Sequence, residues 1–371
     1  MENLKIRRHP AGRKNLPDGY SKEDFARVRA FHESLEGYCP TPLVSLGNLA
    51  KAIGVKGIFV KDESKRFGLN AFKALGASYA VDELLKADPG IQEIVTATDG
   101  NHGRGVAWAA HRAGKRATVF LPRGTVEIRR ANIEETGSAR AEITDLTYDD
   151  AVRHAAAYAQ EHGAALVQDT AFDGYRDIPR NIVLGYSTMA LEAADALDAQ
   201  NIVPTHVFLQ AGVGSMAGGV TACLARGYGA NVPTIAIMEA YNTPCVYESI
   251  RKGTPAAACY SDYTAMAGLN CGEPNPDTLP VIGEFAEYYI QCPDEAAYEG
   301  MRRLAHPMPG DEAVVSGESG AIGIGVLMRL MLDPALDEWK EAMGLNEESV
   351  VLLFSTEGDT DPENYKRVTS E

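Results

Sequence analysis

Lys65-Arg66-Phe67-Gly68-Leu69-Asn70-Ala71-Phe72-Lys73-Ala74-Leu75-Gly76 is the stretch that decides the interpretation of this chain. It places Lys73 where a loop containing Gly and Asn meets a helical pattern. The apolar neighbours Phe72, Ala71 and Leu75 would desolvate the ammonium, which favours the neutral amine that condenses with a carbonyl to form an imine. Most lysines are solvated surface charges, so the rest of the sequence has to decide between the two interpretations.

The composition indicates an ordered globular protein. The chain has 371 residues, of which 45% are hydrophobic and 23% are charged, enough for two sizeable cores. A net charge of −16 disfavours nucleic acid and anionic membrane surfaces as partners. The sequence holds no apolar run of about 18 residues, so no membrane-spanning helix is predicted. The polar, basic segment 1–20 lacks the apolar core of a signal peptide and is expected to be a mobile or loosely docked lead-in.

The six cysteines form no C-x-x-C pair and follow no metal-ligand spacing. No metal site is therefore predicted, and buried free thiols in a reducing cytoplasm are expected. A disulfide between Cys245 and Cys271 stays open, although spacing alone does not support it.

Strand-like and helix-like patterns alternate along most of the chain, which favours an α/β fold with parallel sheets flanked by helices. Ser21 to Asp24 resemble a capping box at the start of a helix. Helices are expected at 73–87, 103–114, 127–137 and 148–163, and buried strands at 57–64, 93–98, 116–122, 141–146, 205–210, 234–239 and 350–356. The pattern is interrupted near 174–179, so a small domain is predicted at 66–180 and a large one at 1–65 plus 181–371.

The glycine-rich segment 210–219 follows a predicted strand and opens a helix. Such a loop can direct several backbone N–H groups and the positive end of a helix dipole at a phosphate. Close packing is the alternative reason for its glycines. A second alternative is a dinucleotide fold, because the next strand ends in Glu239, which could bind a ribose. That alternative is disfavoured since the unit lies mid-chain and would leave Lys73 without a task.

Polar loops follow three other predicted strands. In the loop 98–105, the backbone amides could hold a carboxylate, Asn101 could bond a ring hydroxyl and Asp99 could transfer protons, although the sequence is also typical of a turn. His102 is interpreted as a packed residue. Asp169 ends a strand, where open α/β sheets place ligands, but a helix N-cap is an equal alternative. Hydroxyl-bearing residues at 355–356 end the last strand, and 268–274 and 316–320 resemble site-lining loops of unassigned role.

A lysine before a helix, an Asn-bearing loop, a Gly phosphate loop and a late Ser/Thr strand end occur here in one order. Together they resemble the tryptophan-synthase-β fold family (fold type II) of pyridoxal-phosphate (PLP) enzymes. More closely, seven motifs spread from about Tyr38 to Tyr365 are similar to those of the diaminopropionate ammonia-lyase family: KDESKRFGLNAFK, ATDGNHGRGVAW, VQDTAFDGY, THVFLQAGVGSMAGG, MAGLNCGEPNP, SGESGAIGIG and STEGDTD.

The resemblance implies a two-domain fold and a set of cofactor contacts. Lys73 would carry the PLP imine and Asn101 would meet the ring O3′. Thr356, or Ser355 beside it, would hydrogen-bond the pyridine nitrogen. The phosphate would be held by the loop that contains Gly212, Val213, Gly214, Ser215, Met216 and Gly218.

One departure from the wider fold family concerns the substrate. Racemases and dehydratases of this fold usually carry Ser-Gly-Asn-His, whereas Asp99 occupies the serine position here. A carboxylate there can act as a base and favours a substrate with an extra ammonium group. Asp169 matches a second carboxylate of the lyases. Together with Asp99 and Asp169, Gly100 and Ser319 are the expected substrate-binding residues. The segment 86–95 looks shorter than in the lyase pattern.

The implied reaction is α,β-elimination of 2,3-diaminopropionate, in the D or L form or both, to pyruvate and ammonia. Lys73 or Asp169 would remove the α-proton of one enantiomer and Asp99 that of the other. A homodimer is implied by the resemblance alone, whereas a cytoplasmic location is expected from the free cysteines. Three alternatives stay open: a serine or threonine dehydratase or β-replacing enzyme of the same fold, an NAD-linked enzyme, and a non-catalytic PLP or amino-acid binding protein.

Overall fold

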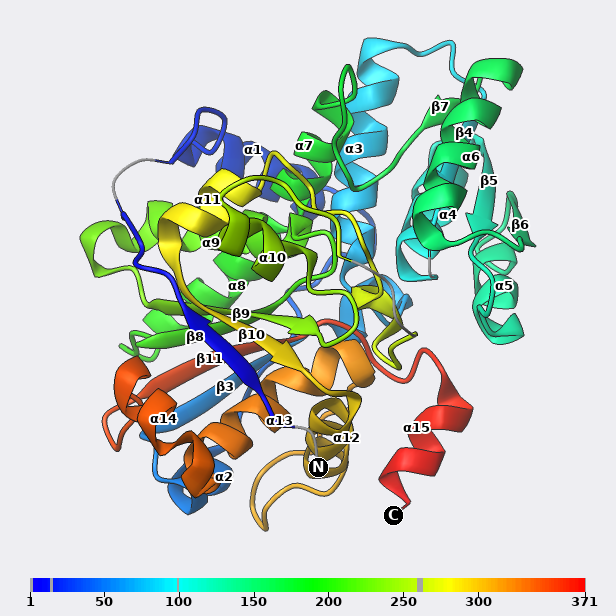
Figure 1. The fold of residues 1–371 in the computed structure, drawn as a ribbon. Coiled ribbons are helices and arrows are strands. Elements are labelled where there is room, and N and C mark those ends of the chain that lie inside the picture. Colours follow the sequence, from blue (N-terminus) through cyan, green and yellow to red (C-terminus); the bar gives the residue numbers. More distant parts are fainter. Residues whose placement is uncertain (1–2, 14–15, 99, 259–262, 371) are drawn as a thin grey trace.

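The computed structural model describes residues 3–13, 16–98, 100–258 and 263–370. Within them, the chain forms a seven-stranded sheet of order β1-β10-β9-β8-β11-β3-β2 and a four-stranded sheet of order β6-β5-β4-β7. The smaller sheet lies to one side of the larger, as Figure 1 shows. This arrangement confirms the predicted α/β fold with parallel-rich sheets flanked by helices.

The large sheet is parallel in its centre and antiparallel at both edges, where β1 pairs with β10 and β2 with β3. Its central strands are buried on both faces, so they are near-continuous apolar runs rather than alternating ones. The strands are β1 (Lys5–Arg8), β2 (Leu43–Ser45), β3 (Gly57–Asp62), β8 (His206–Gln210), β9 (Thr234–Ala240), β10 (Ala286–Cys292) and β11 (Val350–Ser355).

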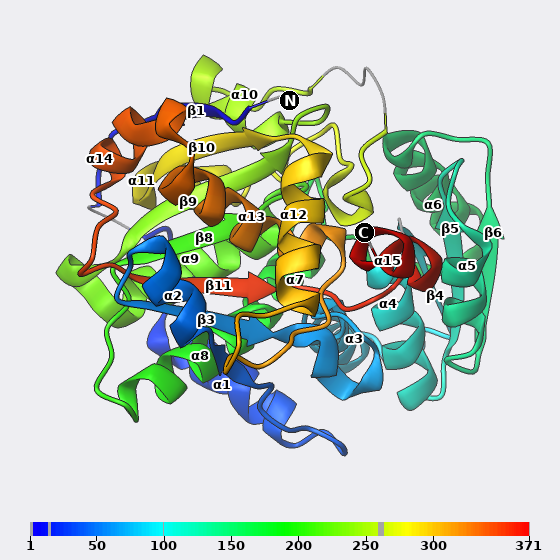
Figure 2. The same ribbon diagram turned by 90° about the horizontal axis from the view of Figure 1, so that it is seen from below.

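Helices cover both faces of the large sheet (Figure 2). Successive strand residues point to opposite faces, so Phe59 and Leu352 belong to one hydrophobic core and Ile58 and Val351 to the other. The first core is covered by α1 (Lys22–Glu33), α7 (Asp177–Gly185), α8 (Ser187–Asp198), α9 (Ser215–Tyr228), α10 (Cys245–Lys252) and α11 (Leu279–Phe285). The second is covered by α2 (Gly47–Ile53), α12 (Asp294–Ala305), α13 (Glu318–Leu332), α14 (Asp337–Met343) and α15 (Pro362–Thr369).

All four strands of the small sheet are parallel, and they lie within the predicted small domain 66–180, whose limits stay a prediction. Helix α6 packs on one face, where Val95 and Phe120 meet Ala151 and Ala155. The strands are β4 (Glu93–Ala97), β5 (Arg116–Leu121), β6 (Ala139–Ile143) and β7 (Ala165–Leu166). The helices are α3 (Lys73–Ala87), α4 (Asn101–Arg112), α5 (Glu127–Glu134) and α6 (Tyr148–His162).

Elements with strong local signals form where the sequence predicts them. The helix expected at 73–87 is α3, and the capping box of α1 is present, with Ser21 Oγ accepting from Asp24 N and the Asp24 carboxylate accepting from Ser21 N. The prediction for the N-terminus was wrong, because Lys5–Arg8 pair with β10 as an edge strand. Four residues are too few to show a strand period, and their partner lies about 280 residues away.

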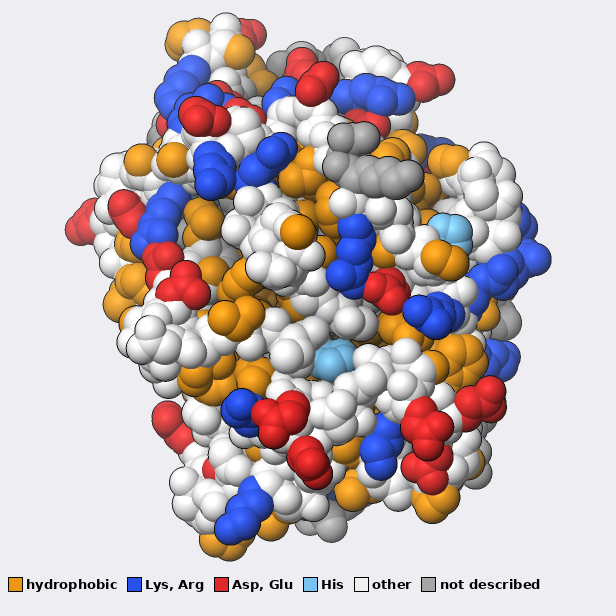
Figure 3. Space-filling model, turned by 90° about the vertical axis from the view of Figure 1, so that its left-hand side faces the viewer, with side chains coloured by type: hydrophobic (Ala, Val, Ile, Leu, Met, Phe, Trp, Pro, Cys, Tyr) orange, Lys and Arg blue, Asp and Glu red, His pale blue; other side chains and the backbone are white. Residues whose placement is uncertain are grey.

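The five described cysteines are free thiols; four are buried and Cys39 is exposed. No single helix in the described ranges is long and apolar enough to cross a membrane; only α13 taken with Pro334–Met343, bent by 91°, has the length and composition, and α13 is mostly buried in the core. On the face shown in Figure 3, acidic and basic side chains are interspersed.

Candidate active site

A cavity lies where the carboxyl ends of β8 and β11 meet the N-terminal ends of α3, α4 and α9. It brings together residues from both sheets and from segments far apart in the sequence, at the edge where open α/β sheets bind ligands. Its lining is Phe72, Lys73, Asn101, His102, Tyr148, Asp169, residues 210–216, Gly268, Leu269, Cys271, Ser319, Thr356 and Glu357.

Lys73 and Asp169 form an ion pair in this cavity, with 2.5 Å between Nζ and Oδ2. The Lys73 side chain is 16% exposed and that of Asp169 only 3%. The apolar surroundings expected for Lys73 include the rings of Phe72 and Tyr186, at 5.5 and 5.8 Å from Nζ. The sequence could not show that the Asp169 carboxylate pairs with Lys73. Burial opposes ionisation of Asp169, but the charges of Lys73 and His102 lower its pKa to about 2.

The loop before Lys73 is fixed on the chain that follows β11. Asn70 adopts a positive φ of 61°, its side chain donates to Asp359 at 3.0 Å, and its carbonyl accepts from Gly358 N at 2.9 Å. Phe72 N donates to Thr356 O at 3.1 Å. The backbone that leads into Lys73 is therefore held at Asn70 and at Phe72.

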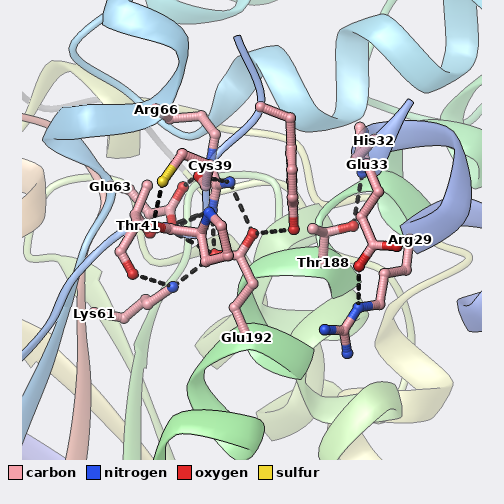
Figure 4. Close-up of polar contacts among 12 residues, drawn as sticks. Arg29, His32, Glu33, Cys39, Thr41, Lys61, Glu63, Arg66, Thr188 and Glu192 are labelled. Carbon is pink, nitrogen blue, oxygen red and sulfur yellow. Dashed lines mark hydrogen bonds and ion pairs between the residues drawn. The ribbon is translucent and has the colours of Figure 1, made fainter. Parts of the chain in front are cut away.

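Farther back, the same loop is held by a buried charge cluster of Lys61, Glu63, Arg66 and Glu192, drawn in Figure 4. Arg66 contacts Glu63 and Glu192 at 2.8 Å each, and Lys61 contacts Glu192 at 2.6 Å. Burial disfavours the charge on Glu192, but hydrogen bonds and charges from Arg66 and Lys61 lower its pKa to about 2. The cluster joins the loop that leads to Lys73 to helix α8.

The glycine-rich loop connects β8 to α9 and needs glycine for backbone reasons. Gly214 has φ +92°, and a Cβ on Gly212 would lie 2.8 Å from Gly268 O. The first N–H groups of α9 have no partner inside the helix and open towards the cavity lined by Gly212, Val213, Gly214, Ser215 and Met216. Gly218, which belongs to the predicted set, packs against Thr278, whose Cβ would be 2.5 Å from an added Cβ, so its role in binding phosphate stays a prediction.

Ser215 connects the glycine loop to Asp169. Its Oγ donates to Asp169 O at 2.5 Å and accepts from Asn275 Nδ2 at 2.8 Å. Asp169 follows β7 in the chain and pairs with Lys73, so its side chain does not serve as the helix N-cap that was the alternative for it.

The Asn-bearing loop is placed as predicted at the start of α4. Gly100 is the N-cap, with φ 147°, and a Cβ added to it would lie 3.0 Å from Arg129 Cδ. Asn101 lines the cavity and donates from Nδ2 to Glu357 Oε2 at 2.6 Å. Asp99, predicted as a base, lies outside the described residues. His102 is buried, its Nε2 bonds Val167 O at 2.9 Å, and burial lowers its pKa.

The structure separates the two hydroxyls at the end of β11. Thr356 lines the cavity and accepts from Gln210 Nε2 at 3.2 Å. Ser355 is directed at Ser316 instead, with 2.7 Å between the two Oγ atoms. Thr356 is therefore the residue of the pair that can reach a ligand, whereas Ser355 ties the strand end to the segment before α13.

Among the described residues, three buried polar atoms of the cavity lining have no hydrogen-bond partner: His102 Nδ1, Gln210 Oε1 and Ser319 Oγ. Buried polar atoms are normally paired, so unpaired ones around a cavity indicate places for a ligand. An amine at Lys73, a helix N-terminus for an anion and polar groups around the remaining space fit a cofactor with an aldehyde, a phosphate and a polar ring, which are the three parts of PLP.

The dinucleotide alternative does not fit this geometry. Both carboxylate oxygens of Glu239 accept backbone N–H groups at 2.7 Å, from Val246 and Tyr247 at the start of α10. The side chain is fully buried there, so it cannot bind a ribose.

Three lining residues were missed as functional residues: Tyr148, Gln210 and Glu357. Tyr148 Oη lies 3.4 Å from Asp169 Oδ1. Gln210 and Glu357 stand inside the quoted motifs, Gln210 as the last residue of β8 and Glu357 two residues after β11, and these places are the signal that could have identified them.

Comparison with known proteins agrees with the geometry. The family described as "Pyridoxal-phosphate dependent enzyme" matches residues 35–355, so the chain belongs to the PLP-dependent enzymes. The diaminopropionate ammonia-lyase of Escherichia coli strain K12 is 44% identical over 369 residues, covering 95% of this chain and 92% of that protein. Within its class, the chain therefore belongs to the diaminopropionate ammonia-lyase family.

Solved structures of the E. coli lyase superpose closely on this chain. The complex with an aminoacrylate-PLP azomethine reaction intermediate has a TM-score of 0.94 at 42% identity, and the complex with D-serine has 0.94 at 41%. Each match covers 99% of this chain and 97% of the solved chain.

Proposed function

We propose that this protein is a PLP-dependent ammonia-lyase that converts 2,3-diaminopropionate to pyruvate and ammonia. The observation that carries the proposal is the Lys73–Asp169 pair, 2.5 Å apart, inside a cavity that also holds the N-terminus of α9. The E. coli relative, at 44% identity, carries the name diaminopropionate ammonia-lyase, and its solved complex holds the intermediate expected after loss of one amino group.

The cofactor would be held by groups from both sheets. Lys73 would bind its aldehyde carbon, and the N–H groups of the loop 212–216 would bind the phosphate. Asn101 would bond the ring hydroxyl and Thr356 the ring nitrogen. When bound, PLP supplies an electron sink for the negative charge formed at the α-carbon.

The Lys73–Asp169 pair would transfer the protons of the reaction. Beside the Lys73 ammonium the pKa of Asp169 is about 2, so the carboxylate is ionised and would favour a proton on the Lys73 nitrogen while that nitrogen holds the cofactor. A Lys73 nitrogen that no longer holds the cofactor would be a neutral amine and could take the α-proton. Loss of the β-amino group as ammonia, followed by hydrolysis with one water, yields pyruvate and a second ammonia.

Carboxylates would also select the substrate. Asp169 is buried and negative beside the cavity, so it favours an amino acid with a second ammonium group over one with a hydroxyl. Asp99 is proposed as the base for the other enantiomer, and Gly100 and Ser319 as substrate contacts. The Ser319 hydroxyl, which has no partner within the described chain, is directly available for that contact.

The test is pyruvate formation from D- and L-2,3-diaminopropionate by PLP-loaded protein, with D-serine, L-serine and L-threonine as comparison substrates. We expect turnover of diaminopropionate to exceed that of the hydroxy amino acids. The D-serine complex of the E. coli relative makes D-serine the most demanding comparison. Faster release of pyruvate from serine, or of 2-oxobutyrate from threonine, would identify a dehydratase and contradict the proposal.

A homodimer and a cytoplasmic location are part of the same proposal and are supported by membership of this family. Sedimentation of the PLP-loaded protein should give the mass of two chains. A single-chain mass at micromolar concentration would contradict the dimer without affecting the assignment of the reaction.

A further inference from the structure

Glu357 is a buried carboxylate of the cavity lining that the proposed chemistry leaves unused. It lies two residues after the end of β11, is 1% exposed and accepts hydrogen bonds from α4, α13 and the loop before α15. Its Oε2 accepts from Asn101 Nδ2 at 2.6 Å and from Thr360 Oγ1 at 3.2 Å, and its Oε1 accepts from Ser319 N at 3.1 Å. All three donors are neutral groups of described residues.

The surrounding backbone holds this carboxylate in one place. The carbonyl of Glu357 accepts from Gly317 N at 3.0 Å, and the residue forms an isolated bridge with Ala71, two positions before Lys73. A Cβ added to Gly317 would lie 3.3 Å from Glu357 Oε1, and one added to Gly320 would lie 2.9 Å from Glu357 O. Gly317 thus allows the close approach of the Glu357 side chain, and Gly320 that of its backbone.

We propose that Glu357 is a positioning residue that fixes the amide of Asn101 so that its second N–H serves the ring hydroxyl of PLP. An asparagine amide presents two N–H donors on one atom and an acceptor on the other, and rotation by 180° exchanges them. The carboxylate accepts hydrogen bonds and donates none when ionised, so it holds the NH2 group on its own side. The inference rests on the proposed function, because it needs the cofactor ring beside Asn101.

Positioning by Glu357 has a measurable consequence for the bound cofactor. An N–H donated to the ring oxygen favours the deprotonated form of that oxygen, so it lowers the pH midpoint of the cofactor's visible absorption change. Loss of the bond would raise the midpoint. The charge of Glu357 acts in the opposite sense, because removing a nearby negative charge would lower the midpoint. The direction of the shift therefore separates positioning from a charge effect.

The experiment is a pH titration of the visible absorption of PLP-loaded wild type, Glu357→Gln and Glu357→Asp. Aspartate keeps the charge but is one methylene shorter, so it isolates the lost contact with Asn101. We expect an upward shift of about 0.5–1 pH unit for Glu357→Asp, the size of one net hydrogen bond. Glu357→Gln should shift upward by less, because loss of the charge opposes the effect.

Two further variants complete the test. Asn101→Ala should shift the midpoint upward, and adding Glu357→Asp to it should give no further shift. Glu318→Gln is the matched control, since Glu318 is the buried carboxylate next to Ser319 that bonds Asn364 instead. Its midpoint should not rise above that of wild type, because this substitution removes a charge without removing a contact to Asn101. An unchanged or lowered midpoint in Glu357→Asp, or a full extra shift in the double variant, would overturn the inference.

The outcomes separate this inference from the proposed function. Wild-type protein without any Lys73-dependent visible band would overturn both. Wild-type protein that shows the band and forms pyruvate, with Glu357→Asp unchanged, would overturn the positioning role alone.

Discussion

The buried charge cluster and the candidate active site are two polar regions beside the same loop, and they differ in how fully their groups are paired. In the cluster, Arg66, Glu63, Glu192 and Lys61 satisfy one another at 2.6–2.8 Å with side chains at most 1% exposed. In the cavity, Gln210 Oε1 and other described polar atoms have no partner. Full pairing makes the first region rigid, whereas incomplete pairing gives the second the capacity to bind.

The two regions differ most at Lys73, because the Lys73–Asp169 ion pair would be broken during the reaction, whereas the ion pairs of the buried charge cluster would stay intact. We expect Lys73→Ala to lower turnover at least about 10³-fold, because it removes both the covalent link and a proton-transfer group. The measurement is pyruvate release from diaminopropionate. Lys65→Ala, an exposed lysine of the same segment, is the control and should retain wild-type turnover. Substantial turnover by Lys73→Ala would show that the two regions do not differ in function.

Asp169→Asn tests the other half of the pair without changing its shape. The neutral amide cannot hold the lysine charge, so turnover should fall by about 10²–10⁴-fold. Steady-state kinetics with both enantiomers will show whether one is affected more, as expected if Asp99 serves the other. Wild-type turnover with both enantiomers would exclude Asp169 from the reaction.

Breaking the charge cluster should cost stability rather than chemistry. Glu192→Ala leaves Arg66 and Lys61 without their shared partner, so the free energy of unfolding should fall by about 3–5 kcal/mol. The matched control is Glu33→Ala, which removes the partly exposed Arg29–Glu33 pair on α1 and should cost less than about 1 kcal/mol. Urea unfolding measures both. Equal costs would mean that pairing inside the cluster adds nothing beyond a surface pair.

A smaller effect concerns His32, which lies behind the cluster between Thr188 Oγ1 and Leu75 O. Burial lowers its pKa to about 4. The unfolded chain therefore binds a proton at His32 below about pH 6.5, whereas the folded protein does so only near pH 4. Stability should fall as the pH falls through this window, by about 1 kcal/mol per pH unit. In His32→Gln the free energy of unfolding should change less with pH, by about 1 kcal/mol per pH unit. Equal changes with pH in wild type and variant would contradict the low pKa of His32.

Much of the fold and part of the site could be predicted because the signals are local. The α3 helix, the glycine loop and the polar strand ends carry their own patterns, and each forms where it was expected. The Lys73–Asp169 pair and the Glu192 cluster could not be predicted, because their partners are 96 and 126 residues apart in sequence and meet only in the folded chain. A motif also names neighbouring residues without saying which of them face the cavity, so the sequence left Thr356 and Ser355 as alternatives and could not show that Gly218 packs on Thr278.

The most direct test of the account is to reduce the PLP-loaded protein with borohydride and map the labelled peptide by mass spectrometry. Reduction makes the bond between the cofactor and its lysine permanent, so the modified residue can be identified. We predict a single label on the peptide that contains Lys73. A label on another lysine, or no label on protein that forms pyruvate, would contradict the account.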